Sequence, residues 1–546
     1  MIPKSYTYGL GQSPLLGETI GDNLRATVKK FPHQPALVCV HQNYRSTYAE
    51  FWKQVEQVAK SLLAIDVKKG DRVALWAPNR FEWVLIQYAT ARIGAILVNI
   101  NPAYRSSELA YVLAQSGSSV VISALHFKGA DYKAMIGEAG ENCPDLKQTI
   151  FLDEGWTEFI AAGKEISDAA LTEVETTLQF DDPINIQYTS GTTGFPKGVT
   201  LSHYNILNNG YFIGKRLQYS ENERVCIPVP FYHCFGMVIG NLCCTSHGAC
   251  MVIPSESFDP LKVLQTVQNE RCTSLYGVPT MFIAELHLPE FHDFDLSSLR
   301  TGVMAGSPCP VEVMKKVQSL MYMRDVEICY GMTETSPVST QTTIGTPLEK
   351  QVGTVGSVQE HLEIKIIDPE TGAIVPRLQA GELCTRGYSV MLSYWKNPVA
   401  TAEAIDEARW MHSGDLATMD EEGYINIVGR IKDMICRGGE NIYPREIEEF
   451  LYTHEAISDV QVIGVPNEKY GEEVMAWVKL RPGFSVTSLE LEAFCKKQIA
   501  HYKTPRYWKF VDGFPMTVTG KIRKVAMREE SIAELNLQHA AAIKTS

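Results

Sequence analysis

The sequence predicts an α/β protein in which a large N-terminal domain of layered, mostly parallel sheets with helices is followed by a small α+β domain. Short apolar strands alternate with helical stretches, as in RVALWAPN (72–79), FEWVLIQYATARIG (81–94) and AILVNI (95–100), and this alternation is typical of βαβ units. The length of 546 residues exceeds what one hydrophobic core usually serves. Both observations favour at least two domains.

The strands expected further along the chain are apolar over their whole length. After a helix over 108–117 and a strand over 119–124 come VCIPVP (225–230), ACMVIP (249–254) and TSLYGV (273–278). A strand whose two faces are both covered by helices has a continuous apolar run, whereas a half-exposed strand alternates. These segments therefore predict the central strands of a doubly wound sheet.

The small domain is expected after GYINIVGR (423–430), where a Gly-rich turn, RGGENIYP (437–444), is followed by a compact αβ segment. Its expected elements are helices over 444–454 and 488–499 and strands over 459–465, 473–480 and 507–512. About 115 residues are enough for such a domain. We place the boundary so that residues 1–431 form the N-terminal domain and residues 432–546 the C-terminal domain.

Composition excludes several classes of protein. Hydrophobic residues make up 45% and charged residues 21% of the chain, which are ordinary values for a globular protein. The formal net charge of −13 argues against nucleic acid as a partner, because a nucleic-acid-binding surface needs clustered Lys and Arg. No segment reads as a signal peptide or a transmembrane helix, so we expect a cytoplasmic protein.

The thirteen cysteines are scattered without CxxC pairs, as expected of reduced thiols in a cytosolic core. Cys243, Cys244, His247 and Cys250 have spacings that would suit metal ligands. They lie, however, in the apolar run GMVIGNLCCTSHGACMVIP (236–254), which predicts a buried helix, a turn and a strand. Core cysteines are the preferred interpretation, because unpaired cysteine is among the most buried residue types.

A loop rich in glycine and threonine follows the apolar strand INIQY (184–188). It contains Thr189, Ser190, Gly191, Thr192, Thr193, Gly194, Phe195, Pro196, Lys197 and Gly198. Glycines let backbone N–H groups approach an anion, hydroxyls donate further hydrogen bonds, and the lysine supplies a cation. The loop is not a Walker A motif, since proline precedes the lysine and glycine follows it. It predicts a phosphate-binding site, with a flexible surface turn as the alternative.

The segment YTSGTTGFPKG (188–198) resembles the phosphate-loop signature of the adenylate-forming superfamily, to which acyl-CoA synthetases, peptide-synthetase adenylation domains and luciferases belong. This resemblance implies that ATP is bound and that a carboxylic acid is activated as its acyl-adenylate. The segment CYGMTETSP (329–337) resembles a second signature of the superfamily and follows an apolar strand, at the kind of strand end where such sheets bind ligands.

The resemblance assigns roles within this second segment. It implies that Tyr330 lies against adenine, that Thr333 meets the α-phosphate and that Glu334 helps to hold Mg²⁺, with Gly331 and Met332 in the same binding segment. An aromatic ring suits a base, a hydroxyl suits a phosphate, and a carboxylate suits a hard cation. A capped helix start is the alternative interpretation of Thr333.

Two further segments resemble nucleotide-binding parts of the superfamily. In LRTGVMAGSPCP (299–310) the resemblance implies that one segment wraps the adenine edge: Ala305, Gly306, Ser307 and Pro308. Ser307 departs from the residue that is commoner at its position. Asp415 and Arg430 are implied to bind the ribose hydroxyls. A carboxylate that accepts from two hydroxyls has sound chemistry, although an Asp in a Ser-Gly-Asp sequence is more often a turn residue.

The segment MTVTGKIRK (516–524) resembles the closing loop of the superfamily, which implies that Lys521 is catalytic. A lysine there would lower the activation barrier for attack of a carboxylate on a phosphate, because the two anions repel each other. The resemblance also implies that the small domain is mobile and swings about a hinge at Lys432. The passage for the pantetheine arm is then expected at Gly438, Gly439 and Glu440, with a tight turn as the alternative for the two glycines.

The acyl site is expected to be apolar. The resemblance places His233 beside the substrate carboxylate, although a histidine in an apolar segment is as often a hydrogen-bonded core residue. The pocket would be lined near Met237, Val278, Met304 and Val338. Because the expected lining contains no lysine or arginine to pair with a second carboxylate, an aliphatic monoacid is favoured over a diacid.

Over nearly its whole length the chain resembles acyl-CoA synthetases of the family member 2 type and bacterial medium- and long-chain fatty-acyl relatives. This implies an ATP-dependent fatty-acid:CoA ligase that forms AMP and pyrophosphate, takes medium-chain acids and uses ATP, Mg²⁺ and coenzyme A. The resemblance leaves a homodimer open. Two alternatives remain: a stand-alone enzyme that loads an acyl carrier protein, and a nonenzymatic nucleotide-binding sensor.

Overall fold

The computed structural model describes residues 3–189, 196–307, 309–437, 440–496, 498–517 and 522–542. Contacts between residues divide the chain into two compact units. The larger unit contains Thr7–Ile364 and Cys384–His412, and the smaller unit contains Met1–Tyr6, Lys365–Leu383 and Ser413–Ser546. The division passes through strands β1 (Tyr6–Tyr8), β19 (Leu362–Ile367), β20 (Gly381–Gly387) and β22 (Met411–Met419).

The first sheet of the larger unit has seven strands. Their order is β21 (Ser393–Tyr394), β11 (Lys197–Ser202), β10 (Pro183–Thr189), β5 (Ile96–Asn99), β4 (Arg72–Trp76), β6 (Val120–Ser123) and β9 (Gln148–Phe151). The five strands from β10 to β9 are parallel, and β11 and β21 add antiparallel pairs at one edge. The expected mostly parallel arrangement is confirmed for this sheet.

The second sheet has nine strands. Their order is β18 (Ser357–Val358), β17 (Val338–Gln341), β16 (Asp325–Gly331), β15 (Thr301–Ala305), β14 (Ser274–Gly277), β12 (Arg224–Cys226), β13 (Cys250–Ile253), β2 (Pro35–Cys39) and β3 (Tyr44–Thr47). The six strands from β16 to β2 are parallel. Strand β12 ends well before the expected residue 230, because Pro228 and Pro230 have no N–H to donate to a neighbouring strand.

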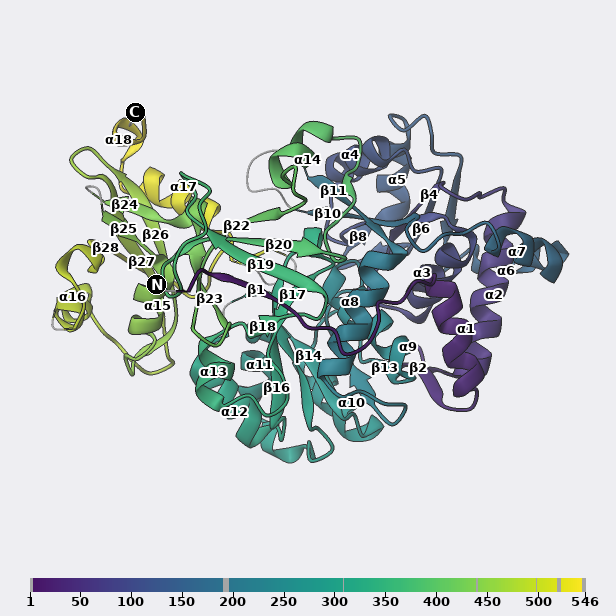
Figure 1. The fold of residues 1–546 in the computed structure, drawn as a ribbon, viewed down its shortest axis with the longest axis horizontal. Coiled ribbons are helices and arrows are strands. Elements are labelled where there is room, and N and C mark those ends of the chain that lie inside the picture. Colours follow the sequence, from purple (N-terminus) through teal and green to yellow (C-terminus); the bar gives the residue numbers. More distant parts are fainter. Residues whose placement is uncertain are drawn as a thin grey trace. The chain divides into compact units, whose positions relative to one another are not determined.

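Helices lie between and outside the two sheets. Helix α3 (Phe81–Ile93) contacts β5 of the first sheet and β2 of the second, and α8 (His203–Arg216) contacts β11 and β17, so both belong to a layer between the sheets (Figure 1). The other helices of this unit are α1 (Ile20–Lys30), α2 (Tyr48–Ala64), α4 (Ser106–Ser116), α5 (Tyr132–Gly140), α6 (Trp156–Ala162), α7 (Asp168–Glu175), α9 (Cys243–His247), α10 (Pro260–Glu270), α11 (Pro279–Leu286), α12 (Val311–Leu320), α13 (Leu348–Gly353) and α14 (Pro398–Ala404).

Short elements complete the larger unit. They are the π-helix η2 (Phe235–Leu242), the 3₁₀ turns η1 (Gly163–Glu165), η3 (Phe291–Asp293) and η4 (Thr333–Thr335), and the strand pair β7 (His126–Phe127) and β8 (Ala130–Asp131). Helix α8 starts where the sequence provides a cap: the Ser202 hydroxyl accepts from the N–H of Asn205 at 3.2 Å, and the Asn205 side chain accepts from the N–H of Ser202 at 2.9 Å. This reciprocal pair fixes the turn from β11 into α8.

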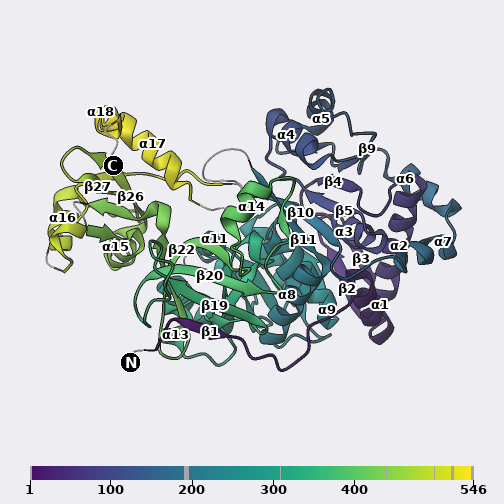
Figure 2. The ribbon, with the colours of Figure 1, turned by 45° about the horizontal axis from the view of Figure 1, so that its top comes forward.

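The smaller unit contains a five-stranded sheet. Its order is β25 (Glu440–Ile442), β24 (Ile435–Arg437), β27 (Gly471–Leu480) and β26 (Ile457–Asn467), and β28 (Tyr507–Phe510) also pairs with β27. Helices α15 (Pro444–Leu451) and α17 (Lys524–Glu534) pack on β26, and α17 is the long yellow helix of Figure 2. Its remaining elements are β23 (Ile425–Arg430), η5 (Ile431–Asp433), α16 (Ser488–Lys496), η6 (His501–Lys503) and α18 (Gln538–Ala542).

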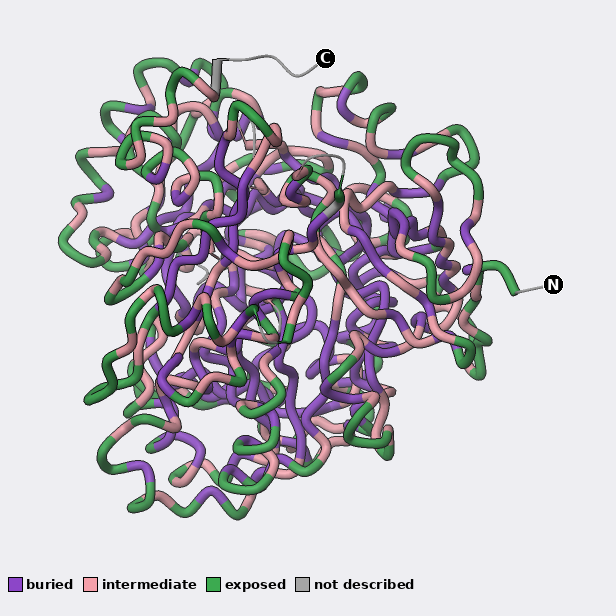
Figure 3. Tube along the Cα trace, turned by 90° about the vertical axis from the view of Figure 1, so that its left-hand side faces the viewer, coloured by how far each residue is buried: buried purple, intermediate pink, exposed green. Residues whose placement is uncertain are grey.

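The apolar strands predicted from the sequence form the cores. Strands β14 and β15 are buried at every residue, and such stretches are the purple runs of Figure 3. Alternate residues of β15 point into different cores: Val303 and Ala305 belong to the large cluster around α3 and β5, whereas Met304 belongs to a second cluster around α10 and α12. This follows from the two-residue period of a strand.

The run with closely spaced cysteines is confirmed as core. Cys243, Cys244 and Cys250 are buried. The Nδ1 of His247 lies 3.1 Å from the carbonyl oxygen of Cys243, and burial lowers the pKa of His247 to about 4. All thirteen cysteines lie in the described part of the chain, and no disulfide joins any two of them.

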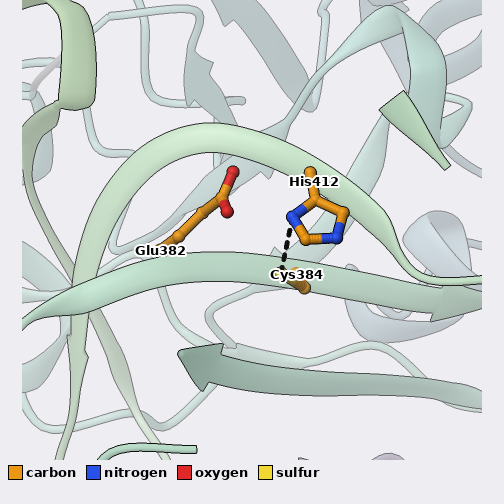
Figure 4. A group of neighbouring side chains, drawn as sticks. All are labelled: Glu382, Cys384 and His412. Atoms are coloured by element: carbon orange, nitrogen blue, oxygen red, sulfur yellow. Dashed lines mark hydrogen bonds between the residues drawn. The ribbon is translucent and has the colours of Figure 1, made fainter. Parts of the chain in front are cut away.

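A cysteine in the middle of β20 and a histidine near the start of β22 are neighbours. The Sγ of Cys384 lies 3.6 Å from Nδ1 of His412, as drawn in Figure 4. Glu382, two residues before Cys384, accepts a hydrogen bond from the N–H of Gly414 at 3.1 Å. Among the described residues, no helix combines the length and the apolar character needed to cross a membrane.

Candidate functional site

The predicted phosphate loop connects two paired strands. Strands β10 and β11 are antiparallel, with Thr189 opposite Lys197, and the Thr189 hydroxyl lies 3.5 Å from the carbonyl oxygen of Lys197. The ends of the loop are therefore held side by side. Its remaining predicted binding residues, Ser190, Gly191, Thr192, Thr193 and Gly194, lie outside the described residues.

Lys197 and Glu334 are joined through a tyrosine that sequence reasoning missed. The Lys197 ammonium lies 4.9 Å from the ring centroid of Tyr394, and the Tyr394 hydroxyl donates to Oε1 of Glu334 at 2.8 Å. Tyr394 is 7% exposed and Glu334 is 6% exposed. Burial, and secondarily the Glu334 carboxylate, raise the pKa of Tyr394, so its hydroxyl stays protonated and can donate.

The segment expected to contact the α-phosphate and Mg²⁺ follows β16. Tyr330 and Gly331 end this strand, and Thr333 and Glu334 lie in the buried turn η4. The capping interpretation of Thr333 is wrong: Met332 precedes the turn, and it is the Thr335 hydroxyl that accepts from the N–H of Met332, at 3.1 Å. The Thr333 hydroxyl is therefore not the cap of this turn.

Three predicted binding positions lie at the same end of adjacent parallel strands. Ala305 of β15 is paired with Cys329 of β16, so Gly306 and Tyr330 both directly follow this pair. Gly306 has a φ of +92°, a backbone conformation that favours glycine, and a Cβ there would lie 3.1 Å from Val278, which directly follows β14. The carboxyl ends of such strands are the usual ligand site of an α/β sheet. Ser307 follows Gly306 and is half-buried, and Pro308 lies outside the described residues.

The structure buries all four side chains predicted for the acyl pocket. Met237 in η2, Val278 and Val338 belong to one buried cluster. Met304 packs in the other core, and its place in the lining stays a prediction. Its neighbour Ala305 is in the cluster with the other three. The sequence did not reveal this. Both faces of a fully buried strand are apolar, so no alternation of polar and apolar residues shows on which face a residue lies.

Polar side chains hold Met237 and the segment before it. The Sδ of Met237 lies 3.1 Å from Nδ2 of Asn99 and 3.0 Å from Nε2 of Gln187, two buried carboxamides on β5 and β10. His233 is half-buried, and its Nδ1 accepts from the N–H of Phe235 at 3.1 Å. The ring of His233 is thereby oriented at the start of η2.

In the smaller unit the two residues predicted to bind ribose are paired. Asp415 on β22 lies opposite Arg430 on β23, and Nε of Arg430 donates to Oδ1 of Asp415 at 3.1 Å. Lys432 is exposed in η5, and Glu440 begins β25. Gly438, Gly439 and Lys521, the other residues predicted here, lie outside the described residues.

The flanks of the loop that contains Lys521 are anchored. Met516 and Ile522 form a β-bridge, and the N–H of Arg523 donates to the carbonyl of Pro515 at 2.8 Å. Lys524, at the start of α17, donates to Glu448 of α15 at 2.6 Å and to the carbonyl of Val462 at 3.0 Å. The chain before the predicted catalytic lysine is thus bonded to the chain after it, which is in turn bonded to α15 and β26.

The geometry agrees with comparisons to known proteins. The AMP-binding enzyme family matches residues 24–395, and the AMP-binding enzyme C-terminal domain matches residues 446–521. The chain is 49% identical to a putative acyl-CoA synthetase, YngI, of Bacillus subtilis, over 96% of this chain and 99% of the relative. It is 45% identical to the mitochondrial medium-chain acyl-CoA ligase ACSF2 of Danio rerio, over 98% of this chain and 92% of the relative.

A solved structure supports the same assignment. The crystal structure of the anthranilate CoA ligase AuaEII in complex with anthranoyl-AMP superimposes with a TM-score of 0.86 at 26% identity, over 96% of this chain and 99% of that chain. The fold is thus α/β, with a large N-terminal part of mixed sheets and a small C-terminal domain. The chain belongs to the AMP-binding enzyme family and is an acyl-CoA synthetase of the adenylate-forming superfamily.

Proposed function

We propose that the chain is an ATP-dependent fatty-acid:CoA ligase that forms AMP and pyrophosphate through an acyl-adenylate and acts on medium-chain aliphatic monocarboxylic acids. The observation that carries the adenylation step is the connection of Lys197 to Glu334 through Tyr394. A cation and a carboxylate that contact the same tyrosine suit a nucleoside triphosphate and its metal ion. The similarity to the medium-chain ligase ACSF2 of Danio rerio supports the choice of acid.

Nucleotide binding is assigned to residues of several predicted motifs. We propose that Lys197 and the loop before it bind phosphate oxygens, that Thr333 meets the α-phosphate and that Tyr330 lies against adenine beside Gly306. Asp415 would accept from the ribose hydroxyls, with Arg430 holding its carboxylate at 3.1 Å. Each role matches the chemistry of its side chain: a cation for an anion, an aromatic face for a base and a carboxylate for hydroxyls.

Magnesium fits the residues near Glu334. The donor set combines a carboxylate with the neighbouring hydroxyl of Thr333, and hard oxygen ligands of this kind suit Mg²⁺. When bound, Mg²⁺ would draw charge from the phosphate oxygens of ATP. The role of Glu334 is to offer one carboxylate oxygen while Tyr394 donates to the other, Oε1.

Two half-reactions follow from this assignment. In the first, a carboxylate oxygen of the acid attacks the α-phosphorus and pyrophosphate leaves, while Lys521 offsets the charge that gathers between the two anions. In the second, the thiol of CoA, as thiolate, attacks the acyl carbon and AMP leaves. We propose that the thiol arrives past Gly438, Gly439 and Glu440 after the C-terminal domain, residues 432–546, has rotated about Lys432.

The acid is proposed to lie against Met237, Val278 and Val338, with its carboxylate beside His233. These three side chains are apolar and buried in one cluster, so a second carboxylate would lose its hydration without gaining a charged partner. A medium-length aliphatic chain gains by being buried there. We further propose a cytoplasmic location, which the absence of disulfides among the thirteen described cysteines supports. Assembly as a homodimer stays a prediction.

The proposal is tested by measuring AMP release with ATP, Mg²⁺, CoA and a panel of saturated C4 to C16 acids. CoA-dependent turnover that peaks at intermediate chain lengths is expected. Turnover only with a phosphopantetheinylated carrier protein in place of CoA would favour the carrier-loading alternative. No acid-dependent consumption of ATP by any acid in the panel would contradict the proposal and favour a nucleotide sensor.

A further inference from the structure

Tyr394 is the link between the strand that follows the phosphate loop and the turn that contains Glu334. It lies in β21, where it is paired with Val199 of β11. Lys197 is two residues before Val199 on the same strand, so its side chain leaves β11 on the same face. On the other side, the N–H of Met391 donates to the carbonyl of Glu334 at 2.9 Å. The backbone around Tyr394 is therefore hydrogen-bonded to both neighbours.

The backbone at Tyr394 is hydrogen-bonded on both sides, and the residue is buried. Its N–H donates to the Thr401 hydroxyl at 2.9 Å, and the N–H of Trp395 donates to the carbonyl of Gly198 at 2.7 Å. The ring is 7% exposed. A rigid ring with a protonated hydroxyl can act on two neighbours at once: its face attracts a cation and its hydroxyl donates to a carboxylate.

We propose that Tyr394 is a positioning residue of the nucleotide site, which holds the Glu334 carboxylate through its hydroxyl and the Lys197 ammonium through its ring. The inference rests on the proposed roles of Glu334 and Lys197 in binding MgATP. Orienting both side chains beforehand reduces the conformational freedom that they lose on binding. None of the sequence motifs of the superfamily quoted above includes this tyrosine.

The two contacts have separable consequences. Tyr394→Phe removes only the hydroxyl, so it frees the Glu334 carboxylate and keeps the ring under Lys197. Tyr394→Leu removes both the hydroxyl and the ring. Glu334 matters for nucleotide binding through the metal ion, whereas Lys197 acts on the phosphates directly. The first substitution should therefore weaken only metal-dependent binding, and the second should also weaken metal-independent binding.

The experiment is calorimetric titration of a nonhydrolysable ATP analogue into the full-length wild type and variants, once with Mg²⁺ and once with EDTA. Tyr394→Phe is expected to lower affinity about tenfold with Mg²⁺, as for a hydrogen bond to a charged group, and less than about twofold in EDTA. Tyr394→Leu is expected to lower affinity in EDTA by about threefold or more, as for a lost cation–π contact. In acid-dependent pyrophosphate exchange, Tyr394→Phe should raise the Mg²⁺ concentration needed for half-maximal rate.

Tyr44→Phe is the matched control. Its hydroxyl donates to the Gln54 carboxamide at 2.6 Å and its ring stacks on Phe81 at 4.0 Å, so it also has one hydroxyl hydrogen bond and one ring contact, in a different part of the larger unit. It should bind the analogue like the wild type under both conditions. Thermal unfolding of each variant shows whether it folds, and Tyr394→Phe tests the inference even if Tyr394→Leu does not fold.

Two results would overturn the inference. One is a Tyr394→Phe protein that binds the analogue with wild-type affinity in Mg²⁺. The other is a loss by the same factor with and without Mg²⁺, which would indicate general damage to the site. A wild type that binds the analogue in neither condition would overturn the proposed function as well, so the two failures are distinguishable.

Discussion

Tyr394 lies outside every predicted motif and contacts two residues that belong to predicted motifs, Lys197 and Glu334. Lys197 and Glu334 were predicted from signatures separated by more than a hundred residues, and Tyr394 of β21 contacts both. The segment around Tyr394 contains no pattern of glycines, charges or hydroxyls that indicates phosphate chemistry. Its role can be seen only in the folded structure, because cation–π and hydroxyl–carboxylate contacts produce no periodic pattern in a sequence.

Lys521 is predicted to act in only one of the two half-reactions. Lys521→Ala should reduce acyl-adenylate formation by about a hundredfold or more, the usual loss when one charge-stabilising group is removed. Thioester formation from supplied acyl-AMP and CoA should stay within about twofold of the wild type, because the domain that carries Lys521 is proposed to have rotated before that step. Pyrophosphate exchange and single-turnover thioester formation measure the two rates separately. Equal losses in both would contradict the assignment.

A buried glutamate beside the nucleotide segment makes stability depend on pH. Burial raises the pKa of Glu327 on β16 to about 8 from its ordinary 4.5, with Asp325 adding to the rise, and contacts to Gln341 and Arg216 only partly oppose it. The folded protein thus binds this proton more tightly than the unfolded chain. Its stabilising contribution is complete below pH 4.5 and is lost as the pH rises through about 8.

The free energy of unfolding should therefore fall between pH 6 and pH 9 more steeply in the wild type than in Glu327→Gln. The excess slope should reach at most about 1.4 kcal/mol per pH unit. Glutamine keeps the shape of the side chain and removes the titrating proton, so urea unfolding of both proteins at a series of pH values isolates this group. Identical slopes would show that Glu327 does not titrate in this range.

At the scale of elements, the sequence predicted which segments form strands and helices better than it predicted their inner faces. The helix over 81–94 and the strands over 119–124 and 273–278 match α3, β6 and β14 closely, since length and flanking glycines or prolines separate them. Met304 was predicted to line the acyl pocket, and the sequence could not show that it packs in a different core from Ala305, because all five residues of β15 are buried. The early end of β12 was readable, since Pro228 and Pro230 interrupt that strand.

The short loop with Lys521 depends on the helix that follows it. Lys524 at the first position of α17 donates to Glu448 at 2.6 Å, and the same Glu448 oxygen accepts from the N–H of Val462 at 2.8 Å. Their side chains are 20% and 9% exposed. This pair ties the start of α17 to α15 and β26, and thereby fixes one end of the loop.

Glu448→Gln should lower pyrophosphate exchange by about tenfold, which corresponds to about 1.4 kcal/mol. Glutamine keeps an acceptor for the Val462 N–H but removes the charge that attracts Lys524. Thioester formation from supplied acyl-AMP should change much less. Lys509→Met is the control, because Lys509 pairs with Glu530 and Glu534 on the same α17 but further from the loop. A similar loss of exchange in the control would show a general effect on the helix.

At the scale of the whole molecule, two compact units must serve two half-reactions. The smaller unit starts at Ser413 and also includes two earlier segments, Met1–Tyr6 and Lys365–Leu383. The sequence instead predicted one boundary, between residues 431 and 432. The sequence shows only where the pattern of expected elements changes along the chain. It does not show which earlier segments pack into the smaller unit. The hinge at Lys432 therefore stays a prediction.

Lys432→Pro should reduce thioester formation more than adenylation, because proline fixes φ and restricts rotation of the backbone at a hinge. A loss of about tenfold in the ratio of the two rates would correspond to about 1.4 kcal/mol. Stopped-flow release of pyrophosphate and quenched-flow thioester formation give that ratio. If adenylation falls as much as thioester formation, the hinge is elsewhere.

The central claim, that the acid is activated as an acyl-adenylate and then transferred to CoA, is tested most directly by following oxygen. A medium-chain acid labelled with ¹⁸O in both carboxylate oxygens is incubated with the enzyme, ATP, Mg²⁺ and CoA, and the products are analysed by mass spectrometry. Attack of the carboxylate on the α-phosphorus, followed by thiol attack on the acyl carbon, leaves one labelled oxygen in AMP and one in the thioester. Label in pyrophosphate or free phosphate, with none in AMP, would contradict the account.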